Sequence, residues 1–394
     1  MEHVHAQAAR NSPRAKLRIG IVAGEASGDL LGAHLIRALN RLAPDMEFIG
    51  VAGPKMIAAG ATSLFPMEKL AVRGYIEVLR HYREIVGIRR KLIEYFITNP
   101  PDVFIGIDAP DFNLELEEKL KVKGITTIHY VGPSIWAWRG ERIRKIARAV
   151  SHILVLFPFE KQIYEQARIP VTYVGHPLGD MLPLDPSRQT AREQLKLPQG
   201  DRVITMLPGS RQSELEYLAD LFVQTAQKIV QHQPNIRFLV PLVSRETRRI
   251  FESALYRCGG QDLPLTILFG HAHEAITAAN VVLVASGTAT LETALLKRPM
   301  VITYKVSKLT WKLAKRRGYL PYVGLPNILA GRFIVPEFLQ EEATSDNLAQ
   351  ALLNLMNDQK VGAGLLSYFT EMHASLRQNT DDKVASAILP YISR

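Results

Sequence analysis

The sequence contains almost no cysteine and no long apolar run, and these absences narrow its class. Cys258 is the one cysteine among 394 residues, which excludes an intrachain disulfide framework and a cysteine-rich zinc site and favours a reducing compartment. No segment reaches the roughly 18 to 20 uninterrupted apolar residues of a membrane-spanning helix. The first sixteen residues lack the apolar core of a signal peptide. We expect residues 1–16 to be a disordered tail and the protein to be cytoplasmic.

Positive charge is in excess, but it is concentrated in short segments. The net charge is +10. Residues 73–97 carry six positive and three negative charges, residues 139–148 five and one, and residues 305–317 six and none. These segments sum to +13, so the rest of the chain is slightly acidic. Such patches favour an anionic surface or an anionic ligand as partner.

Strand-like apolar runs alternate with helical patterns along the whole chain. Continuous Val, Ile and Leu runs between helices are typical of parallel sheets that helices cover on both faces. The fold class predicted is therefore α/β, with two doubly wound, Rossmann-like domains that face one cleft. The runs are "LRIGIVA", "EFIGV", "VFIGI", "TTIHYV" and "HILVLF" in the first half, and "RVITMLPGSR", "IRFLVPLV", "LTILFG", "VVLVASG" and "MVITY" in the second.

The alternation breaks once, at residues 175–190, where prolines lie among polar residues as they do in linkers. We therefore place a first domain at residues 17–185 and a second at residues 186–345. Residues 346–394 have a helical pattern and are candidates to pack back on the first domain. In such folds ligands bind beyond the carboxyl ends of the strands, so the residues that follow each strand are the ones to inspect.

Three glycines follow the first strand in "AGEASGDLLGA", but their spacing matches neither the dinucleotide nor the phosphate-loop signature. Gly24 and Gly28 let the backbone pass close to a ligand, or they form a merely tight turn. Ser27 or Asp29 can cap the helix that follows. Gly32 permits close packing of helix on strand.

A carboxylate ends the third strong strand in "GIDAPDF". Asp111, in the first turn of the helix that Pro110 opens, is explained by the helix dipole. Asp108 lies at the strand end, where it faces the cleft and can accept a proton from a substrate hydroxyl. We interpret Asp108 as a candidate general base, with simple helix capping as the alternative.

Two strand-to-helix turns of the second half have the composition of an anion site. "LPGSRQSEL" brings a hydroxyl at Ser210 and a guanidinium at Arg211 to a helix start; the alternative is an exposed arginine beside a serine cap. "ASGTATLE" exposes backbone amides at Thr288. Glu292 lies one turn further, where a carboxylate beside a phosphate site suits ribose hydroxyls. Together these turns predict a site for the diphosphate of a sugar nucleotide.

Metal binding and cofactors are not expected. The eleven histidines include one close pair, His271 and His273, and no acidic cluster resembles a magnesium–nucleotide site. His176, near the linker, suits either a structural role or a ligand contact. No nucleophile-elbow motif is present.

The basic segments are also amphipathic. Residues 73–96 have a helical apolar stripe, with arginines and Lys91 on the other faces. Such a helix either packs on the sheet or lies at an anionic bilayer surface and receives a lipid. "KVSKLTWKLAKRRG" and "SIWAWRGERIRKIAR" are further candidates, although the tryptophans of the latter also suit an acceptor cleft.

An ordered set of motifs resembles one family. The chain is similar to the lipid-A-disaccharide synthases, inverting glycosyltransferases of GT-B fold, from about residue 17 to about residue 342. The motifs that carry the resemblance are "VAGEASGDLLGA", "FIGVAGPKM", "VFIGIDAPDFN", "TTIHYVGPSIWAWR", "PFEK", "LPGSR", "ASGTATLE" and "LPNILAGR".

The resemblance implies transfer of 2,3-diacylglucosamine from its UDP donor to 2,3-diacylglucosamine 1-phosphate. The product is a β(1→6) disaccharide, with release of UDP, on the cytoplasmic face of the inner membrane. By similarity Asp108 is the base and Arg211 and Glu292 serve UDP, while Ser27 and Asn327 are weaker carry-overs as cleft residues. A homodimer is suggested, although the residues alone do not demand one. Gly132 departs from the pattern, where serine is expected before the proline.

Other classes remain open at this level. A UDP-sugar epimerase or a soluble glycosyltransferase fits the same scaffold, although the basic amphipathic helix argues against both. A sugar-nucleotide sensor without catalysis is also compatible with the fold. A nucleic-acid-binding protein is suggested by the isoelectric point of 9.6, but no zinc, RRM or helix-turn-helix signature supports it.

Overall fold

The computed structural model describes most of the chain. The side chains of helix α3 (Tyr75–Thr98) are described from Tyr82 onward. The predicted tail up to residue 15, and parts of the three basic segments, among them the side chain of Arg80 and the whole of Trp138, lie outside the described residues. The described residues are 16–43, 45–70, 75–137, 140–308, 310–312 and 320–392.

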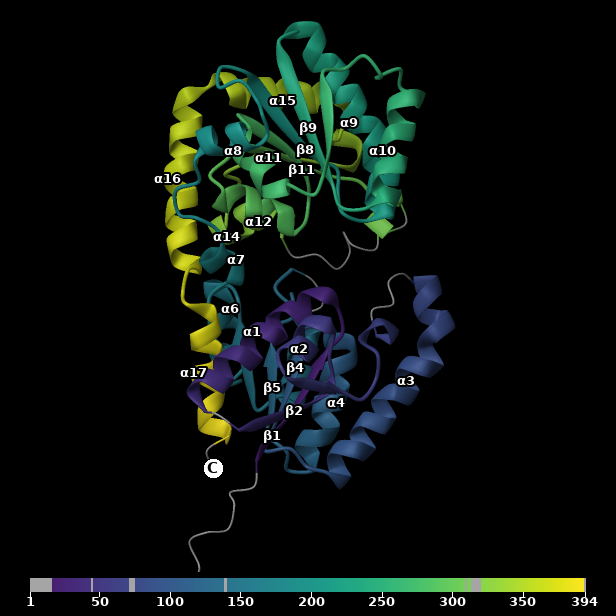
Figure 1. The fold of residues 1–394 in the computed structure, drawn as a ribbon, viewed down its shortest axis with the longest axis vertical. Helices are drawn as coiled ribbons and strands as arrows, with labels where there is room; N and C mark the ends of the chain where they lie inside the picture. Colours follow the sequence, from purple (N-terminus) through teal and green to yellow (C-terminus); the bar gives the residue numbers. More distant parts are fainter. Residues whose placement is uncertain are drawn as a thin grey trace, which may run out of the picture. The chain divides into compact units, whose positions relative to one another are not determined.

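The chain forms two compact units, each built on its own parallel sheet (Figure 1). The first unit comprises the described residues up to Ile135, Gly140–Val174 and those from Asn379 onward. The second comprises the described part of Gly175–Gln378, together with Trp136 and Ala137. The change between units falls at residue 175, where the proline-containing segment begins; our predicted boundary was residue 185.

The first unit contains a seven-stranded sheet with strand order β3-β2-β1-β4-β5-β6-β7, in which every neighbouring pair is parallel. Its strands are β1 (Leu17–Ala23), β2 (Met46–Val51), β3 (Ala61–Ser63), β4 (Val103–Ile107), β5 (Thr127–Tyr130), β6 (His152–Val155) and β7 (Val171–Tyr173). Its helices are α1 (Ala26–Leu42), α2 (Pro54–Ala58), α3, α4 (Pro110–Val122), α5 (Ile143–Ala149), α6 (Pro158–Gln166) and α17 (Thr380–Ile392).

The second unit repeats this topology with a six-stranded parallel sheet of order β10-β9-β8-β11-β12-β13. Its strands are β8 (Arg202–Leu207), β9 (Ile236–Leu242), β10 (Leu265–Phe269), β11 (Val281–Ala285), β12 (Met300–Tyr304) and β13 (Glu337–Leu339). Its helices are α7 (Pro177–Met181), α8 (Arg188–Gln194), α9 (Gln212–His232), α10 (Arg245–Arg257), α11 (Ala272–Ala278), α12 (Thr288–Leu295), α14 (Leu325–Ala330), α15 (Ser345–Asn357) and α16 (Gln359–Leu376).

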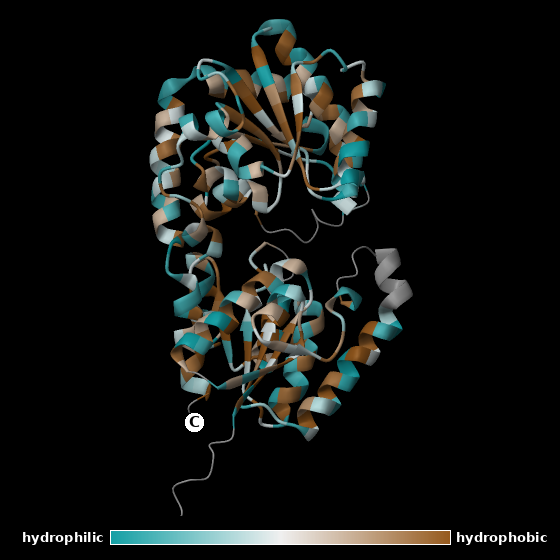
Figure 2. Ribbon diagram, in the orientation of Figure 1, coloured by the Kyte–Doolittle hydropathy of each residue, from teal (hydrophilic) through white to brown (hydrophobic). Residues whose placement is uncertain are grey.

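The central strands are apolar because helices cover both of their faces. All five residues of β4 and all five of β11 are buried. Figure 2 shows mostly apolar colour along the strands, whereas the helices alternate between polar and apolar faces. Continuous apolar strands are typical of parallel sheets, and this was the pattern from which the α/β class was predicted.

The C-terminal helices are divided between the units. Helices α15 and α16 belong to the second unit and α17 to the first. Ile388 and Ile392 of α17 are buried in the first core. The carboxylate of Asp381 contacts Nδ1 of His34 on α1 at 2.9 Å, and that of Asp382 accepts from Arg41 at 2.8 Å. Apolar burial and two polar contacts thus hold α17 on the first unit.

The described part of α3 uses its cations in two ways. Arg89 is buried, pairs with Glu115 at 2.8 Å and lies over the ring of Phe112, so it packs the helix on its unit. Arg90 and Lys91 are exposed. None of the described helices is both long enough and apolar enough to cross a membrane.

Candidate functional site

Both sheets bring the residues singled out in the sequence to a topological switch point. Strand order reverses between β1 and β4 in the first sheet and between β8 and β11 in the second. In doubly wound folds the crevice at the carboxyl ends of such strands is the usual ligand site. Ser27 and Asp108 follow β1 and β4, whereas Arg211 and Thr288 follow β8 and β11. Each unit therefore carries candidate residues at the edge where a ligand is expected.

Asp108 is held in an uncommon backbone conformation. Its φ is +52° and that of Ala109 is +44°, whereas non-glycine residues rarely adopt positive φ. The amide of Asp108 donates to the carbonyl of Tyr130 at the end of β5 at 2.9 Å. Two successive left-handed residues cost of order 1–3 kcal/mol each and persist where the surroundings impose them, often at functional sites. The side chain is partly exposed, so a substrate can approach it.

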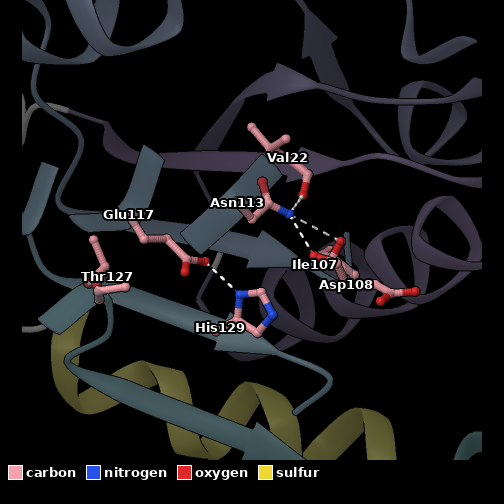
Figure 3. Close-up of polar contacts among 8 residues, drawn as sticks. Val22, Ile107, Asp108, Asn113, Glu117, Thr127 and His129 are labelled. Atoms are coloured by element: carbon pink, nitrogen blue, oxygen red, sulfur yellow. Dashed lines mark hydrogen bonds and ion pairs between the residues drawn. The ribbon is translucent and has the colours of Figure 1, made fainter. Parts of the chain in front are cut away.

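Asn113 helps to impose this conformation. Its side chain is fully buried on α4. Figure 3 shows its amide nitrogen directed at three carbonyls. It donates to the carbonyl of Asp108 at 2.9 Å, of Ile107 at 3.3 Å and of Val22 at 3.4 Å. The first turn of α4 is thus fastened to the ends of β1 and β4.

A buried ionisable pair lies one helical turn further along α4. Glu117 and His129 are both fully buried, and Oε1 of Glu117 lies 2.8 Å from Nδ1 of His129 (Figure 3). Burial lowers the pKa of His129, but the charge of Glu117, the hydrogen bond to it and the charge of Asp108 together raise it above its ordinary value. This pair was not predicted from the sequence. The available signal was a glutamate at i+4 from Asn113 on the apolar face of α4.

The loop after β1 touches the loop after β4. A Cβ atom on Gly24 would lie 2.8 Å from Cβ of Ala109, so Gly24 is required by this close approach. A Cβ on Gly28 would lie 3.3 Å from that of Ala23, and one on Gly32 would lie 2.5 Å from the sulfur of Met56. Gly28 and Gly32 therefore both serve the packing of α1.

The predicted caps of α1 are wrong. The helix begins at Ala26, its N-cap is Glu25, and no side chain caps it. Ser27 is exposed in the first turn. Asp29 is buried and instead accepts hydrogen bonds from the amides of Lys55 at 3.0 Å and Met56 at 2.9 Å. Asp29 thus caps α2, because the loop after β2 passes close to it, a proximity that local sequence does not reveal.

Local contacts explain Asp111 and Gly132. Asp111 lies in the first turn of α4 and pairs with Arg142, as its expected dipole role allows. The departure at Gly132 also has a cause. A Cβ there would lie 3.0 Å from Val155 and 3.2 Å from the hydroxyl of Tyr164, so a serine would crowd both.

In the second unit, Arg211 is the N-cap of α9 and an internal carboxylate already contacts this turn. Oε2 of Glu214 accepts from the amide of Ser210 at 2.9 Å and from that of Arg211 at 3.2 Å. The guanidinium of Arg211 contacts Oε1 of Glu214 at 3.4 Å and is 60% exposed. These two amides serve the capping box, so the exposed guanidinium is what this turn offers to an anion.

The N-terminus of α12 is the more open of the two turns. Gly287 is its N-cap, with φ of +152°, and no side chain caps the helix. Gly287 and Thr288 are exposed. Thr290 is buried; its hydroxyl donates to the carbonyl of Gly287 at 2.8 Å and accepts from the amide of Leu325 at 3.2 Å. An exposed, uncapped helix N-terminus favours anions.

Glu292 lies one turn inside α12, beside two histidines. Its Oε2 is 3.4 Å from Nε2 of His273 on α11. The hydrogen bond that His273 donates to Glu292, together with the charge of Glu292, outweighs burial and raises the pKa of His273. Burial lowers the pKa of His176 to about 4, although the charges of Glu292 and Asp180 oppose this. Both histidines are conspicuous in the sequence, but their proximity to Glu292 could not be predicted from it.

Asn327 is fully buried, and its carboxamide is used within the unit. Its nitrogen donates to the carbonyl of Val335 at 2.9 Å and to Glu337 at 2.8 Å. Its oxygen accepts from the amides of Ile334 at 2.7 Å and Val335 at 3.0 Å. Glu337 in turn accepts from the amide of Gly324 at 2.9 Å, at the start of α14. Asn327 therefore holds α14 against β13.

The described residues offer no set of side chains that could bind a metal ion together. No group of three or more histidine, cysteine, aspartate or glutamate side chains there is placed to hold a metal ion.

The chain matches a family model over most of its length. The model described as lipid-A-disaccharide synthetase matches residues 19–388. Among curated proteins, the lipid-A-disaccharide synthase of Methylobacillus flagellatus is 62% identical over 374 residues, which cover 95% of this chain and 99% of that protein. The lipid-A-disaccharide synthase of Dechloromonas aromatica is 58% identical over 374 residues, with coverages of 95% and 98%.

Solved structures share the fold at low identity. A UDP-GlcNAc 2-epimerase from Neisseria meningitidis, bound to UDP-GlcNAc, aligns with a TM-score of 0.62 at 12% identity, over 95% of this chain and 100% of that one. A glycosyltransferase from Rickettsia africae aligns with a TM-score of 0.57 at 11% identity, over 97% and 99%. These likenesses support the two-sheet α/β architecture of GT-B proteins.

Proposed function

Because the chain belongs to the lipid-A-disaccharide synthase family, we propose that Asp108 is the general base of its glycosyl transfer. The protein is a hexosyltransferase that synthesises the lipid A disaccharide from a UDP-sugar donor and a glycolipid acceptor. The observation that carries the assignment is the position of Asp108. It is a partly exposed carboxylate at the switch point of the first sheet, on a left-handed backbone that Asn113 and Tyr130 hold.

The substrates that we propose are UDP-2,3-diacylglucosamine and 2,3-diacylglucosamine 1-phosphate. The carboxylate of Asp108 takes the proton of the acceptor 6-hydroxyl as its oxygen attacks the anomeric carbon. The bond from that carbon to the UDP oxygen breaks, the anomeric configuration inverts, and UDP leaves with the bonding electron pair. A base for the nucleophile and positive groups for the leaving diphosphate are the two requirements of this step.

The second unit supplies the groups for the leaving diphosphate in this proposal. The exposed guanidinium of Arg211 and the N-terminus of α12 at Thr288 receive the diphosphate charge, with the hydroxyl of Ser210 nearby in sequence. Glu292 accepts from the ribose hydroxyls. Asn327 acts by holding α14, and we assign no substrate atom to it. In the first unit, exposed Ser27 follows β1 and is proposed to contact the acceptor.

We further propose that the protein works on the inner face of the inner membrane, as a peripheral protein. The motivating observations are the localised basic segments and the exposed cations Arg90 and Lys91 on α3. Positive side chains near the surface of an anionic leaflet contribute about 1 kcal/mol each to binding. A homodimer stays a prediction of the family resemblance. Sedimentation with anionic and with neutral vesicles tests the membrane proposal, and equal binding to both would contradict it.

The decisive experiment is direct conversion. Purified protein is mixed with UDP-2,3-diacylglucosamine and 2,3-diacylglucosamine 1-phosphate in detergent micelles with EDTA, and products are identified by mass spectrometry. Disaccharide 1-phosphate with stoichiometric UDP is expected. UDP binding by calorimetry without any product would reject these substrates. Family membership favours this reaction over the epimerase, sensor and nucleic-acid alternatives.

A further inference from the structure

The environment of His129 follows from the strand register. Gly106 on β4 pairs with His129 on β5, and Ile107 pairs with Tyr130. His129 therefore lies one residue before the strand position whose carbonyl binds the amide of Asp108. Gly106 has no side chain, and the carboxylate of Glu117 occupies the space beside it, since a Cβ there would lie 2.1 Å from Oε1.

The buried site around Glu117 and His129 contains polar atoms that have no packing role. Oε2 of Glu117, Nε2 of His129 and Oδ1 of Asn113 are buried and have no hydrogen-bond partner among the described residues. Buried polar atoms are normally paired, and buried ionisable groups cost stability that apolar side chains of similar volume do not. A cluster of this kind directly behind a candidate base suggests a role in its chemistry.

Resting on the proposed function of Asp108, we propose that Glu117 and His129 are positioning residues for this base. They form a buried carboxylate–imidazole pair that holds a positive charge behind the carboxyl end of β4 and keeps the Asp108 carboxylate ionised.

The charges of Glu117 and of Asp108 both favour the protonated form of His129. Glu117 stabilises the protonated imidazole by charge and by hydrogen bond, and the charge of Asp108 acts in the same direction. The interaction between two charges is mutual, so a protonated His129 favours the ionised form of Asp108. The pair thus allows Asp108 to stay ionised, and so to act as a base, at lower pH.

Titratable groups on β6 and on the helix α6 that follows it make contacts of their own. On the adjacent strand β6, Nε2 of His152 lies 2.8 Å from the hydroxyl of Thr172. On α6, the carboxylate of Glu160 accepts from the amide of Phe157 at 2.9 Å. The charges that act on His129 are those of Glu117, from α4, and Asp108, from the turn after β4.

The test is the pH dependence of kcat/KM in wild type, Glu117→Gln and Glu118→Gln. The first variant keeps the shape of the side chain but removes its charge. The second makes the same change on the same helix at a residue that pairs with Arg148. In Glu117→Gln the buried imidazole of His129 loses the carboxylate that keeps it protonated. The positive charge near Asp108 is then lost, and the acid limb of the kcat/KM profile is expected to move upward by about 1 pH unit, the effect of losing one nearby opposite charge. Glu118→Gln keeps the wild-type limb.

His129→Gln removes the same positive charge directly and leaves the Glu117 carboxylate without its partner, so it is expected to move the acid limb upward at least as far. The double variant carries neither charge and is expected to move the limb as Glu117→Gln does. A purely structural role predicts equal loss of activity at every pH with an unmoved limb, and that outcome overturns the proposal. Thermal unfolding of each variant shows whether it is folded at the temperature of the assay.

A second measurement does not depend on these variants folding. NMR of histidine-labelled wild type and Asp108→Asn follows the titration of His129. The pKa of His129 is expected to fall in Asp108→Asn, and an unchanged titration contradicts the coupling. Full turnover in Asp108→Asn would reject the base assignment itself, whereas an inactive Asp108→Asn with an unmoved limb in Glu117→Gln would reject only the pair.

Discussion

A Cβ atom on Gly106 of β4 would lie 2.1 Å from Oε1 of Glu117 on α4, so the buried carboxylate has room only because residue 106 has no side chain. The same Cβ would lie 3.0 Å from that of Asn113. One glycine thus admits both of the buried polar side chains that α4 directs at the sheet.

Gly106→Ala is therefore expected to lower the free energy of unfolding by about 1–3 kcal/mol, the usual cost of overpacking. Denaturant unfolding measures this. Gly87→Ala is the matched control, because a Cβ on Gly87 in α3 meets nothing within 4 Å. That change should be neutral or stabilise by up to about 1 kcal/mol. Equal stability of the two variants would show that Glu117 can move aside without cost.

Asp108→Asn is expected to lower turnover by at least about 10²-fold, the range for loss of a general base. UDP affinity should stay near that of wild type, because the groups proposed for UDP lie in the other unit. Steady-state rates and calorimetry measure the two effects. Asp111→Asn, an exposed carboxylate in the next turn, should retain turnover. Wild-type rates in Asp108→Asn would end the assignment.

Glu292→Ala is expected to raise the KM for the UDP-sugar by roughly tenfold, as for a lost hydrogen bond to a charged group, with little change in the KM for the acceptor. The variant should also lower the pKa of His273, since Glu292 is the main group that raises it. Kinetics and histidine NMR test the two effects separately. Glu252→Ala, at a partly exposed residue on α10, is the control. An unchanged donor KM would contradict the ribose role.

His176 predicts acid destabilisation of the second unit. Its Nδ1 accepts from the amide of Leu178 at 3.2 Å, and its pKa is lowered to about 4. In the unfolded chain, His176 binds a proton with a pKa near 6.5. Its contribution to the free energy of unfolding is therefore complete above about pH 6.5 and is lost as the pH drops toward 4. The loss amounts to about 3 kcal/mol, at about 1.4 kcal/mol for each pKa unit.

His176→Asn tests this, since asparagine caps a helix but does not titrate. The variant should match wild type at pH 7 and lose less stability between pH 6.5 and pH 4. Parallel pH profiles of unfolding free energy would assign the acid loss to other groups.

Asn327→Ala is expected to lower stability by about 3 kcal/mol, because it leaves the amides of Ile334 and Val335 without a buried partner and removes one of the donors to Glu337. Activity and melting temperature should fall together. Gln350→Ala, which removes an exposed contact on α15, is the control. Full stability with lost donor binding would instead favour direct contact of Asn327 with a substrate.

The alternation of apolar strands with helical patterns was enough to predict two parallel α/β units. Pro110 was predicted to open a helix, and α4 is observed at Pro110–Val122. This succeeds because the period of apolar residues reflects local geometry, and because strands covered on both faces must be apolar throughout. The candidates after the strands could be named for the same reason, since every parallel strand ends at the same edge.

Contacts between residues distant in sequence decided the rest. Asp29 caps α2 because two loops meet, Glu214 occupies the amides of Ser210 and Arg211, and Glu117 finds His129 only when α4 lies across β5. The sequence motifs were enough to predict the family and the candidate base Asp108. What surrounds that base depends on strand order and register, because hydrogen bonds and charges act through distances in space, which only the folded chain establishes.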